Sequence, residues 1–203
     1  MKSLVLIGNG GHCKSCIEVI ETSKEFKIKG IVVKPEDQTK ELMNYKVIGD
    51  DNNLKKCFNN DDQALICVGQ IKSPEKRINL FNLLLKNKIS LATLRSNTSI
   101  ISNYASLGCG SCVMHNVVIN AGAKIGFNCI LNTNSLIEHD TIIGNHCHVS
   151  TGAIINGDVE IGNGCFLGSG VIIREGVKIG DESVISAGQI VMNDIPPKTI
   201  FKN

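Results

Sequence analysis

The sequence is poor in aromatic residues and has no block of charge of one sign. Phe, Trp and Tyr make up 4% of the 203 residues, and 21 Lys and Arg stand against 19 Asp and Glu, which gives a net charge of +2. A nucleic-acid-binding surface needs a basic patch and, for single strands, aromatic side chains on which bases stack. The sequence provides neither, so we expect no nucleic acid partner.

An apolar run of membrane-spanning length is also missing. No apolar stretch approaches the roughly 18 residues that a spanning helix requires, so we expect no membrane segment. Residues 1–7 hold one Lys and a short apolar run that ends at Gly8, which is typical of a buried strand and not of a signal peptide. Nine cysteines without an export signal indicate a reducing compartment, so we expect free thiols and a cytoplasmic location.

What the sequence does have is a six-residue period. From Ile101 to Val191, sixteen consecutive positions spaced by six are Leu, Ile or Val. A second column, four residues after the first, is mostly small or β-branched, and Gly often follows the first column. This period is the signature of a parallel β-helix, in which three hexapeptides form one triangular coil. Residues 18 apart in the sequence therefore stack on neighbouring coils, about 4.8 Å apart.

No insertion interrupts this register, so no long loop of the prism could enclose a coenzyme. A site on such a surface has to use short turns and neighbouring subunits, and we expect a homotrimer with threefold symmetry. In the second column, Cys129, Cys147 and Cys165 are spaced by 18. We expect them to serve as small buried apolar residues and not as a metal or redox ladder.

Residues 1–95 follow a different pattern, in which short apolar strands alternate with segments of helical spacing. Strands are expected at residues 4–7, 28–33 and 64–68, and helices around residues 16–20 and from Pro74. Such alternation is typical of a small parallel α/β domain. The expected fold is therefore an N-terminal Rossmann-like α/β domain, residues 1–95, followed by a parallel β-helix of hexapeptide repeats, residues 96–203.

The first strand runs into the turn GNGGH, residues 8–12, where such domains hold phosphate. Bare backbone lets an anion come close, and the N-terminus of the next helix directs free N–H groups toward it. A dinucleotide fingerprint would need Gly at position 13, which is Cys, so we favour a simpler nucleoside diphosphate over NAD. A tight turn without a ligand is the alternative.

Two cysteine motifs imitate other chemistry. Cys13-x-x-Cys16 looks like a redox motif, but it falls where the domain needs its phosphate turn and first helix. Cys109-x-x-Cys112-x-x-His115 looks like a zinc site, but it is short of four tetrahedral ligands. We expect no metal.

Three segments resemble the bacterial sugar acyltransferases of the PglD/NeuD type: GNGGH at 8–12, ICVGQ at 66–70 followed by Arg77, and the run from Ile130 to Gly168. The resemblance covers essentially the whole chain. It implies a left-handed β-helix, a homotrimer, and acetyl-CoA as co-substrate in the groove between neighbouring prisms. The implied reaction is N-acetylation of the 4-amino group of a UDP-linked 4-amino-4,6-dideoxy-N-acetylhexosamine. O-acetylation of sialic acid or a related nonulosonic acid is the alternative, and a non-catalytic trimeric scaffold is a third.

The resemblance also assigns roles to single residues. His139 matches the catalytic base, Asp140 its acidic partner, and Gly157 a glycine whose backbone N–H faces the reacting carbonyl of the coenzyme's acetyl group. Asn132 matches a residue near the sugar amine, and His148 one near the pantetheine or thioester. The substrate-binding residues implied in the N-terminal domain are Gly8, Gly10, Gly11, His12 and Gly69.

Two places depart from the family pattern. Val33-Lys34 stands at the end of the second strand, where relatives often have Asp residues that read the uracil, and this leaves the base and sugar specificity open. The chain ends in Ile200-Phe201-Lys202-Asn203 in place of a G-x-P-A-K tail, and we expect this difference to bear on how the far end of coenzyme A is held.

The register supports part of the assignment without the resemblance. Gly157 comes 18 residues after His139, so it stacks one coil above it, about 5 Å away at the backbone. Histidine suits a general base because its ordinary pKa lies near the working pH. Asp140 could fix the tautomer of His139 and stabilise the imidazolium, and a Gly N–H could approach an oxyanion. Direct transfer in a ternary complex is the simpler hypothesis, since no nucleophilic Cys is needed.

Overall fold

The computed structural model describes residues 1–202, and its N-terminal part is built on one sheet in the order β3-β4-β2-β1-β5-β6. Neighbouring strands run parallel except β3 and β4, which form a hairpin. The elements of this part are β1 (Lys2–Ile7), α1 (Gly11–Ser23), β2 (Phe26–Val33), β3 (Glu41–Leu42), β4 (Tyr45–Asp50), the 3₁₀ helix η1 (Asp51–Cys57), β5 (Gln63–Ile66), α2 (Glu75–Lys86) and β6 (Ser90–Leu91). Across residues 1–202, no helix is long and apolar enough to cross a membrane.

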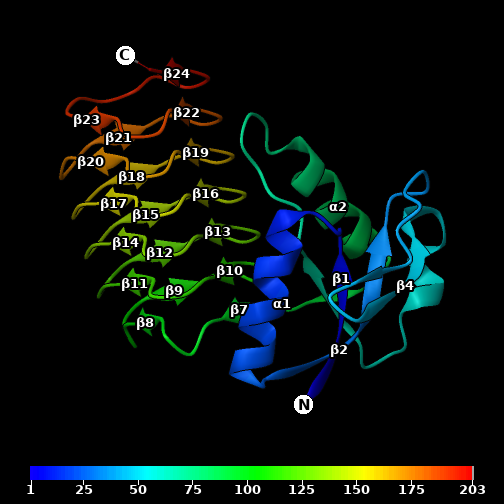
Figure 1. Cartoon of the computed structure of the whole chain (residues 1–203). Helices are drawn as coiled ribbons and strands as arrows, with labels where there is room; N and C mark the ends of the chain where they lie inside the picture. Colours follow the sequence, from blue (N-terminus) through cyan, green and yellow to red (C-terminus); the bar gives the residue numbers. More distant parts are fainter. Residues whose placement is uncertain (203) are drawn as a thin grey trace.

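The central strand β1 explains the unbroken apolar run near the start of the sequence. Leu4 and Leu6 pack in the same cluster as α1, whereas Val5 and Ile7 pack with residues of α2. A parallel strand that is covered on both faces needs apolar residues at every position. Figure 1 shows α1 between this sheet and the prism, so the helix is itself covered on two sides.

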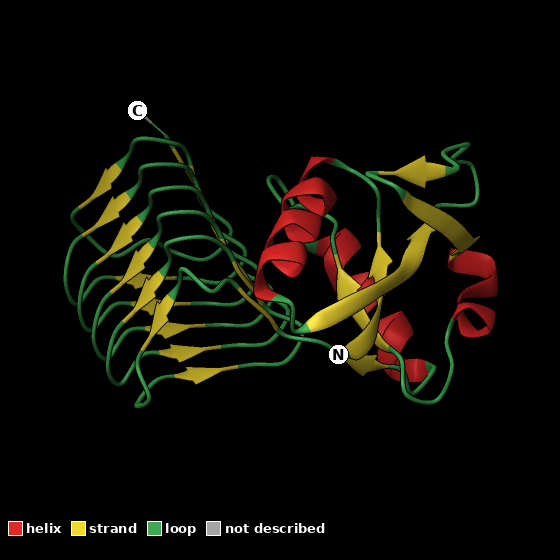
Figure 2. Cartoon of the chain, turned by 60° about the horizontal axis from the view of Figure 1, so that its bottom comes forward, coloured by secondary structure: helices red, strands yellow, loops and turns green. Residues whose placement is uncertain are grey.

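The C-terminal part is a left-handed β-helix with three parallel sheets, and Figure 2 shows its strands stacked coil upon coil. Sheet 1 contains β7-β10-β13-β16-β19-β22-β24, sheet 2 contains β8-β11-β14-β17-β20-β23, and sheet 3 contains β9-β12-β15-β18-β21. The strands are β7 (Leu94–Arg95), β8 (Ile100–Ile101), β9 (Ser106–Leu107), β10 (Cys112–Val113), β11 (Val118–Ile119), β12 (Lys124–Ile125), β13 (Ile130–Leu131), β14 (Leu136–Ile137), β15 (Ile142–Ile143), β16 (His148–Val149), β17 (Ile154–Ile155), β18 (Glu160–Ile161), β19 (Phe166–Leu167), β20 (Ile172–Ile173), β21 (Lys178–Ile179), β22 (Val184–Ile185), β23 (Ile190–Val191) and β24 (Ile200–Phe201).

The strands pair in the register that the sequence period predicts. Leu136 pairs with Ile154, and Ile154 with Ile172, so each step between coils is 18 residues. The last coil departs from this step, since Val184 pairs with Ile200. At the other end, β6 still belongs to the N-terminal sheet while β7 already pairs with β10. The chain therefore changes sheet at residues 92–93.

Short turns at the three corners of each coil allow this tight stacking. Corner A follows sheet 1 (residues 114–116, 132–134, 150–152 and 168–170), corner B follows sheet 2 (120–122, 138–140, 156–158 and 174–176), and corner C follows sheet 3 (108–110, 126–128, 144–146, 162–164 and 180–182). The last residue of each turn has positive φ, as in Asn134 (+60°), Asp140 (+60°) and His146 (+58°). Gly, Asn and Asp tolerate this left-handed conformation best, which explains their frequency at the corners.

The interior of the prism is aliphatic with one column of thiols. Cys129, Cys147 and Cys165 are fully buried, and their Sγ atoms donate to the carbonyl oxygens of Gly144, Gly162 and Gly180 at 3.2, 3.0 and 3.2 Å. Each thiol therefore has a backbone acceptor, as suits a small buried residue. All nine cysteines of the chain are free thiols.

Arg77 fixes the N-terminal domain against the prism. Its side chain is buried, Nη1 donates to the carbonyl oxygens of Ile66 and Val68 at 3.0 and 2.7 Å, and Nη2 donates to Asn128 Oδ1 at 2.7 Å. Beside it, the rings of Phe81 and Phe127 stack with their centroids 4.9 Å apart. The domain is therefore held on sheet 1 and corner C, and corner B stays free.

The two residues of β15 provide a test of the inward and outward columns. Ile143 is 1% exposed and Ile142 is 43% exposed. We expect Ile143→Ala to lower the free energy of unfolding by about 2–5 kcal/mol, because it leaves a cavity in the prism. The matched change Ile142→Ala should cost within about 0.5 kcal/mol. Urea unfolding followed by circular dichroism would check this, and equal losses would contradict the assigned register.

Candidate functional site

His139 and Asp140 form a hydrogen-bonded pair at corner B, directly after β14. His139 Nδ1 lies 2.9 Å from Asp140 Oδ2. A carboxylate can only accept, so Nδ1 carries the proton and Nε2 keeps its lone pair for another partner. Both side chains project from the prism, with 65% and 67% of their surface exposed. The pair therefore presents a basic nitrogen of fixed tautomer to the outside.

Gly157 lies one coil above His139, as the spacing predicts. The pairing of Ile137 with Ile155 sets this register, and a Cβ added to Gly157 would lie 2.7 Å from both Cε1 and Nε2 of His139. The imidazole can rest there only because residue 157 has no side chain. The neighbouring N–H groups of Asn156 and Asp158 donate to Ile173 O and His139 O. Within residues 1–202, the Gly157 N–H has no acceptor, so it can donate to a ligand.

An open groove runs across corner B beside this pair. Seven residues line it: Glu138, His139, Asn156, Gly157, Asp158, Glu175 and Gly176. Three of them carry carboxylates, and with Asp140 nearby the surroundings of His139 are acidic. Such a surface favours the approach of a cation and disfavours that of an anion.

The glycine turn of the N-terminal domain forms a second pocket, of about 600 Å³, at the carboxyl ends of β1, β2 and β5. All five residues predicted to bind substrate there line it: Gly8, Gly10, Gly11, His12 and Gly69. Gly8 has φ +106°, and a Cβ would lie 2.7 Å from Val68 Cγ2, so the turn requires glycine. Gly10 caps α1 without a side-chain hydrogen bond, so the first N–H groups of the helix are open to an anion.

Charged side chains that the sequence did not single out also line this pocket. Lys34 and Lys76 come from the end of β2 and from α2, and both suit a diphosphate. Asp37 accepts from the backbone N–H of Thr39 at 2.8 Å and from Asn9 Nδ2 at 2.9 Å. Hydrogen bonds from Thr39 and then from Asn9 lower the pKa of Asp37, which keeps the carboxylate ionised. Asp37 therefore places an acidic acceptor in this pocket, although Val33-Lys34 ends the strand.

Asn132 and His148 lie together at the edge of sheet 1, not with His139. His148 Nδ1 donates to Gln70 O at 2.6 Å, its Nε2 is 3.4 Å from Asn132 Nδ2, and its ring meets the edge of Phe166. Burial lowers the pKa of His148 to about 4, so the ring is neutral near pH 7. Within one chain, His148 joins the prism to the N-terminal domain. Its contact with the coenzyme stays a prediction.

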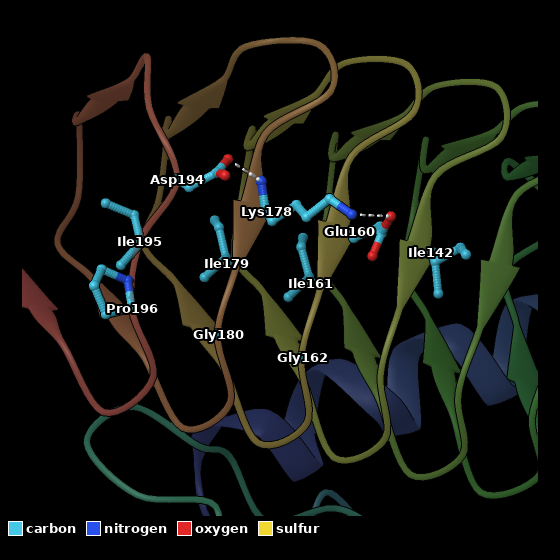
Figure 3. Close-up of a pocket in the computed structure, with 10 residues that line it drawn as sticks. All are labelled: Ile142, Glu160, Ile161, Gly162, Lys178, Ile179, Gly180, Asp194, Ile195 and Pro196. Carbon is cyan, nitrogen blue, oxygen red and sulfur yellow. Dashed lines mark hydrogen bonds and ion pairs between the residues drawn. The ribbon is translucent and has the colours of Figure 1, made fainter.

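A third hollow, on the outer face of sheet 3, has aliphatic walls and paired charges (Figure 3). Glu160 Oε1 accepts from Lys178 Nζ at 2.9 Å, and Asp194 Oδ1 accepts from the Lys178 backbone N–H at 2.8 Å. With its carboxylates bonded to Lys178 and no histidine in its lining, this hollow offers no free base. Of these two surfaces, only the groove at corner B has a histidine that can act as a base.

Comparisons with known proteins agree with both parts of the chain. Residues 3–83 match the family model of the PglD N-terminal domain, and residues 158–188 match that of the bacterial transferase hexapeptide (six repeats). No curated protein sequence matches the chain.

Solved structures share the whole architecture. The acetyltransferase domain of PglB from Neisseria gonorrhoeae is 26% identical, with 98% of this chain and 95% of that chain covered and a TM-score of 0.89. A structure of the same domain contains acetyl coenzyme A, with 25% identity, 97% and 94% coverage and a TM-score of 0.88. PerB from Caulobacter crescentus, in complex with CoA and GDP-perosamine, is 29% identical, with 97% and 92% coverage and a TM-score of 0.88.

The low pKa of His148 predicts a pH dependence of stability. A histidine whose pKa is about 4 in the folded state and about 6.5 when unfolded stabilises the fold above pH 6.5, and this contribution is lost as the pH falls toward 4. Urea unfolding of the wild type should show a loss of about 1–2 kcal/mol from this group between pH 7 and pH 5.

His148→Asn is the matched variant, because its amide can still donate to Gln70 O but does not titrate in this range. We expect the difference between pH 7 and pH 5 to shrink in this variant. An unchanged difference would mean that other groups produce the acid sensitivity.

Proposed function

We propose that this chain, which has the N-terminal domain and hexapeptide prism of the PglD-type sugar acyltransferases, is an acetyl-CoA-dependent sugar N-acetyltransferase. Its substrate is the 4-amino group of a UDP-linked 4-amino-4,6-dideoxy-N-acetylhexosamine, and its base is His139. The observation that carries the proposal is the His139–Asp140 pair against Gly157, on an architecture whose neighbours bind CoA and a nucleotide sugar.

The geometry supports direct transfer. The neutral amine attacks the thioester carbonyl carbon, and an N–C bond forms while the carbonyl oxygen becomes an oxyanion. The free N–H of Gly157 is the donor for that oxyanion. His139 Nε2 removes a proton from the amine nitrogen, and Asp140 stabilises the imidazolium. The C–S bond then breaks, and the imidazolium returns the proton to the leaving thiolate of coenzyme A.

The charge of the groove favours an amine over sialic acid. An amino sugar carries a positive charge before it loses a proton, and the carboxylates of Glu138, Asp158 and Glu175 attract it. N-acetylated sialic acid has no ammonium group for these carboxylates to attract. O-acetylation is therefore the less favoured activity for this surface.

The nucleotide pocket and the groove lie at different places on one chain. Arg77 and Phe81 fix the N-terminal domain on sheet 1 and corner C, while His139 is on corner B. Between corners A and B, sheet 2 presents an outward column that is entirely aliphatic: Ile100, Val118, Leu136, Ile154, Ile172 and Ile190. Ile100 and Ile190 are 67% and 59% exposed. A second copy that covers this column removes apolar surface from water.

Threefold packing of this face also completes the site. When one face of each of three prisms turns toward a common axis, one edge of each prism meets the other edge of the next. We infer that corner A of one subunit, with Asn132 and with His148 of the adjoining strand β16, meets corner B of the next, with His139 and Gly157. The homotrimer would thus bring the predicted coenzyme and sugar contacts to the base.

The substrate assignment predicts which acceptor becomes acetylated. Incubated with acetyl-CoA, the enzyme should add one acetyl group to a UDP-linked 4-amino sugar. Mass-spectrometric fragmentation should place that acetyl group on the amine. A GDP-linked 4-amino sugar tests the specificity for the nucleotide's base, and sialic acid tests the alternative O-acetylation. Acetylation of sialic acid in preference to both amino sugars would contradict the proposal.

The mechanism predicts distinct kinetic losses at the pair. His139→Ala should lower kcat by about 10² to 10⁴ with little change in KM for either substrate, because the base acts in the transition state. Asp140→Asn should cost less, because it disturbs orientation but leaves the base. Steady-state kinetics at saturating acetyl-CoA would measure both. Near-normal turnover in His139→Ala would show that the base lies elsewhere.

A further inference from the structure

The coil below the His139–Asp140 pair has a feature that neither the sequence pattern nor the comparisons assign. Gly122 occupies corner B 18 residues before Asp140, and so lies one coil below it. A Cβ added to Gly122 would collide with Asp140 Oδ1 and would lie 3.3 Å from Asp140 Cγ. The carboxylate of Asp140 therefore lies against the bare Cα of Gly122.

Backbone conformation alone does not explain this glycine. Gly122 has φ +78°, but Asp140 and Asp158 occupy the same position of the next two coils with φ +60° and +57°. Residues with a side chain are thus accepted at this turn position. What distinguishes residue 122 is the Asp140 carboxylate above it, which takes the space that a Cβ would fill.

The same lower coil also separates the two acids that flank His139. Asn120 Nδ2 donates to Glu138 Oε2 at 2.8 Å, which draws Glu138 downward. Asp140 is left as the partner of His139 Nδ1, at 2.9 Å. The pair is bracketed by two glycines, with Gly157 leaving room for the imidazole and Gly122 leaving room for the carboxylate.

We propose that Gly122 is a positioning residue for the reaction: its missing side chain lets Asp140 hold the Nδ1–H tautomer of His139. The proposal rests on the proposed function, because it concerns the orientation of the base assigned there. A side chain at residue 122 would turn the carboxylate away, break its hydrogen bond with Nδ1 and leave the imidazole free to rotate. Neither substrate touches residue 122 in this proposal, so binding should survive.

The test compares Gly122→Ala with Gly188→Ala. Gly188 has φ +70°, close to that of Gly122, and a Cβ there would meet nothing within 4 Å. The control therefore introduces similar backbone strain without the collision. We expect Gly122→Ala to lower kcat at least about tenfold, to the level of Asp140→Ala, with KM unchanged. Gly188→Ala should keep wild-type kcat.

A double-mutant cycle separates positioning from general damage. In the Asp140→Ala background the carboxylate is gone, so adding Gly122→Ala should lower kcat no further than Gly188→Ala does. A full additional loss would overturn the proposal, as would a kcat for Gly122→Ala equal to that of the control. If Gly122→Ala does not fold, Gly122→Asn replaces it with Gly188→Asn as control, because Asn is accepted at φ +60° in residue 134.

A measurement that does not depend on catalysis separates failure of the Gly122 proposal from failure of the proposed function. The imidazole ¹⁵N shifts of His139 report which ring nitrogen carries the proton. We expect the Nδ1–H form in the wild type and in Gly188→Ala, and its loss in Gly122→Ala and Asp140→Ala. If His139→Ala stays active while these shifts change as expected, the base assignment fails and the positioning by Gly122 stands. Unchanged shifts in Gly122→Ala would overturn the positioning itself.

Discussion

Parallel pairing of backbone between coils 18 residues apart is the constraint on which the rest of this structure depends. Each coil is only three short strands and three turns, so it cannot bury an apolar face alone, and stacking supplies the core. The same pairing places side chains one above another at a spacing near 4.8 Å. A catalytic group at a corner therefore has two neighbours that the sequence fixes in advance, one coil above and one below. The neighbour above His139 is Gly157 and the neighbour below Asp140 is Gly122, which leaves room for an imidazole and a carboxylate on an otherwise closely stacked edge.

Much of this could be predicted because hexapeptide spacing is a geometric rule. The columns, the inward thiols of Cys129, Cys147 and Cys165, and the stacking of Gly157 on His139 all followed from counting residues. The structure confirms them because no insertion breaks the count between β7 and β23. In the N-terminal domain, the strands around Leu4–Ile7 and Ala64–Ile66 were visible because parallel strands covered on both faces are apolar throughout.

What the sequence could not reveal depends on tertiary contacts that have no period. The hairpin β3-β4 and the helix η1 lie in a polar stretch, so no apolar pattern marked them. Asp37 reaches the pocket at the glycine turn through a loop held by Asn9, which is 28 residues away in the sequence. The family resemblance predicts that His148 contacts the coenzyme. Its packing against Gln70 was not predictable, because it depends on how the N-terminal domain docks on sheet 1. The role of Gly122 needed the direction of the Asp140 side chain, which spacing alone does not give.

In the proposed homotrimer, one subunit supplies the base and another supplies the pocket at the glycine turn, and mixed trimers test this most directly. His139→Ala lacks the base but keeps the glycine turn, whereas Gly11→Val keeps the base but blocks the turn. Each variant alone should be nearly inactive. Unfolded together, mixed and refolded, they should regain activity, with up to about a quarter of the sites intact under random assembly. Mixtures that stay as inactive as the separate variants, although they form mixed trimers, would show that each chain carries a complete site of its own.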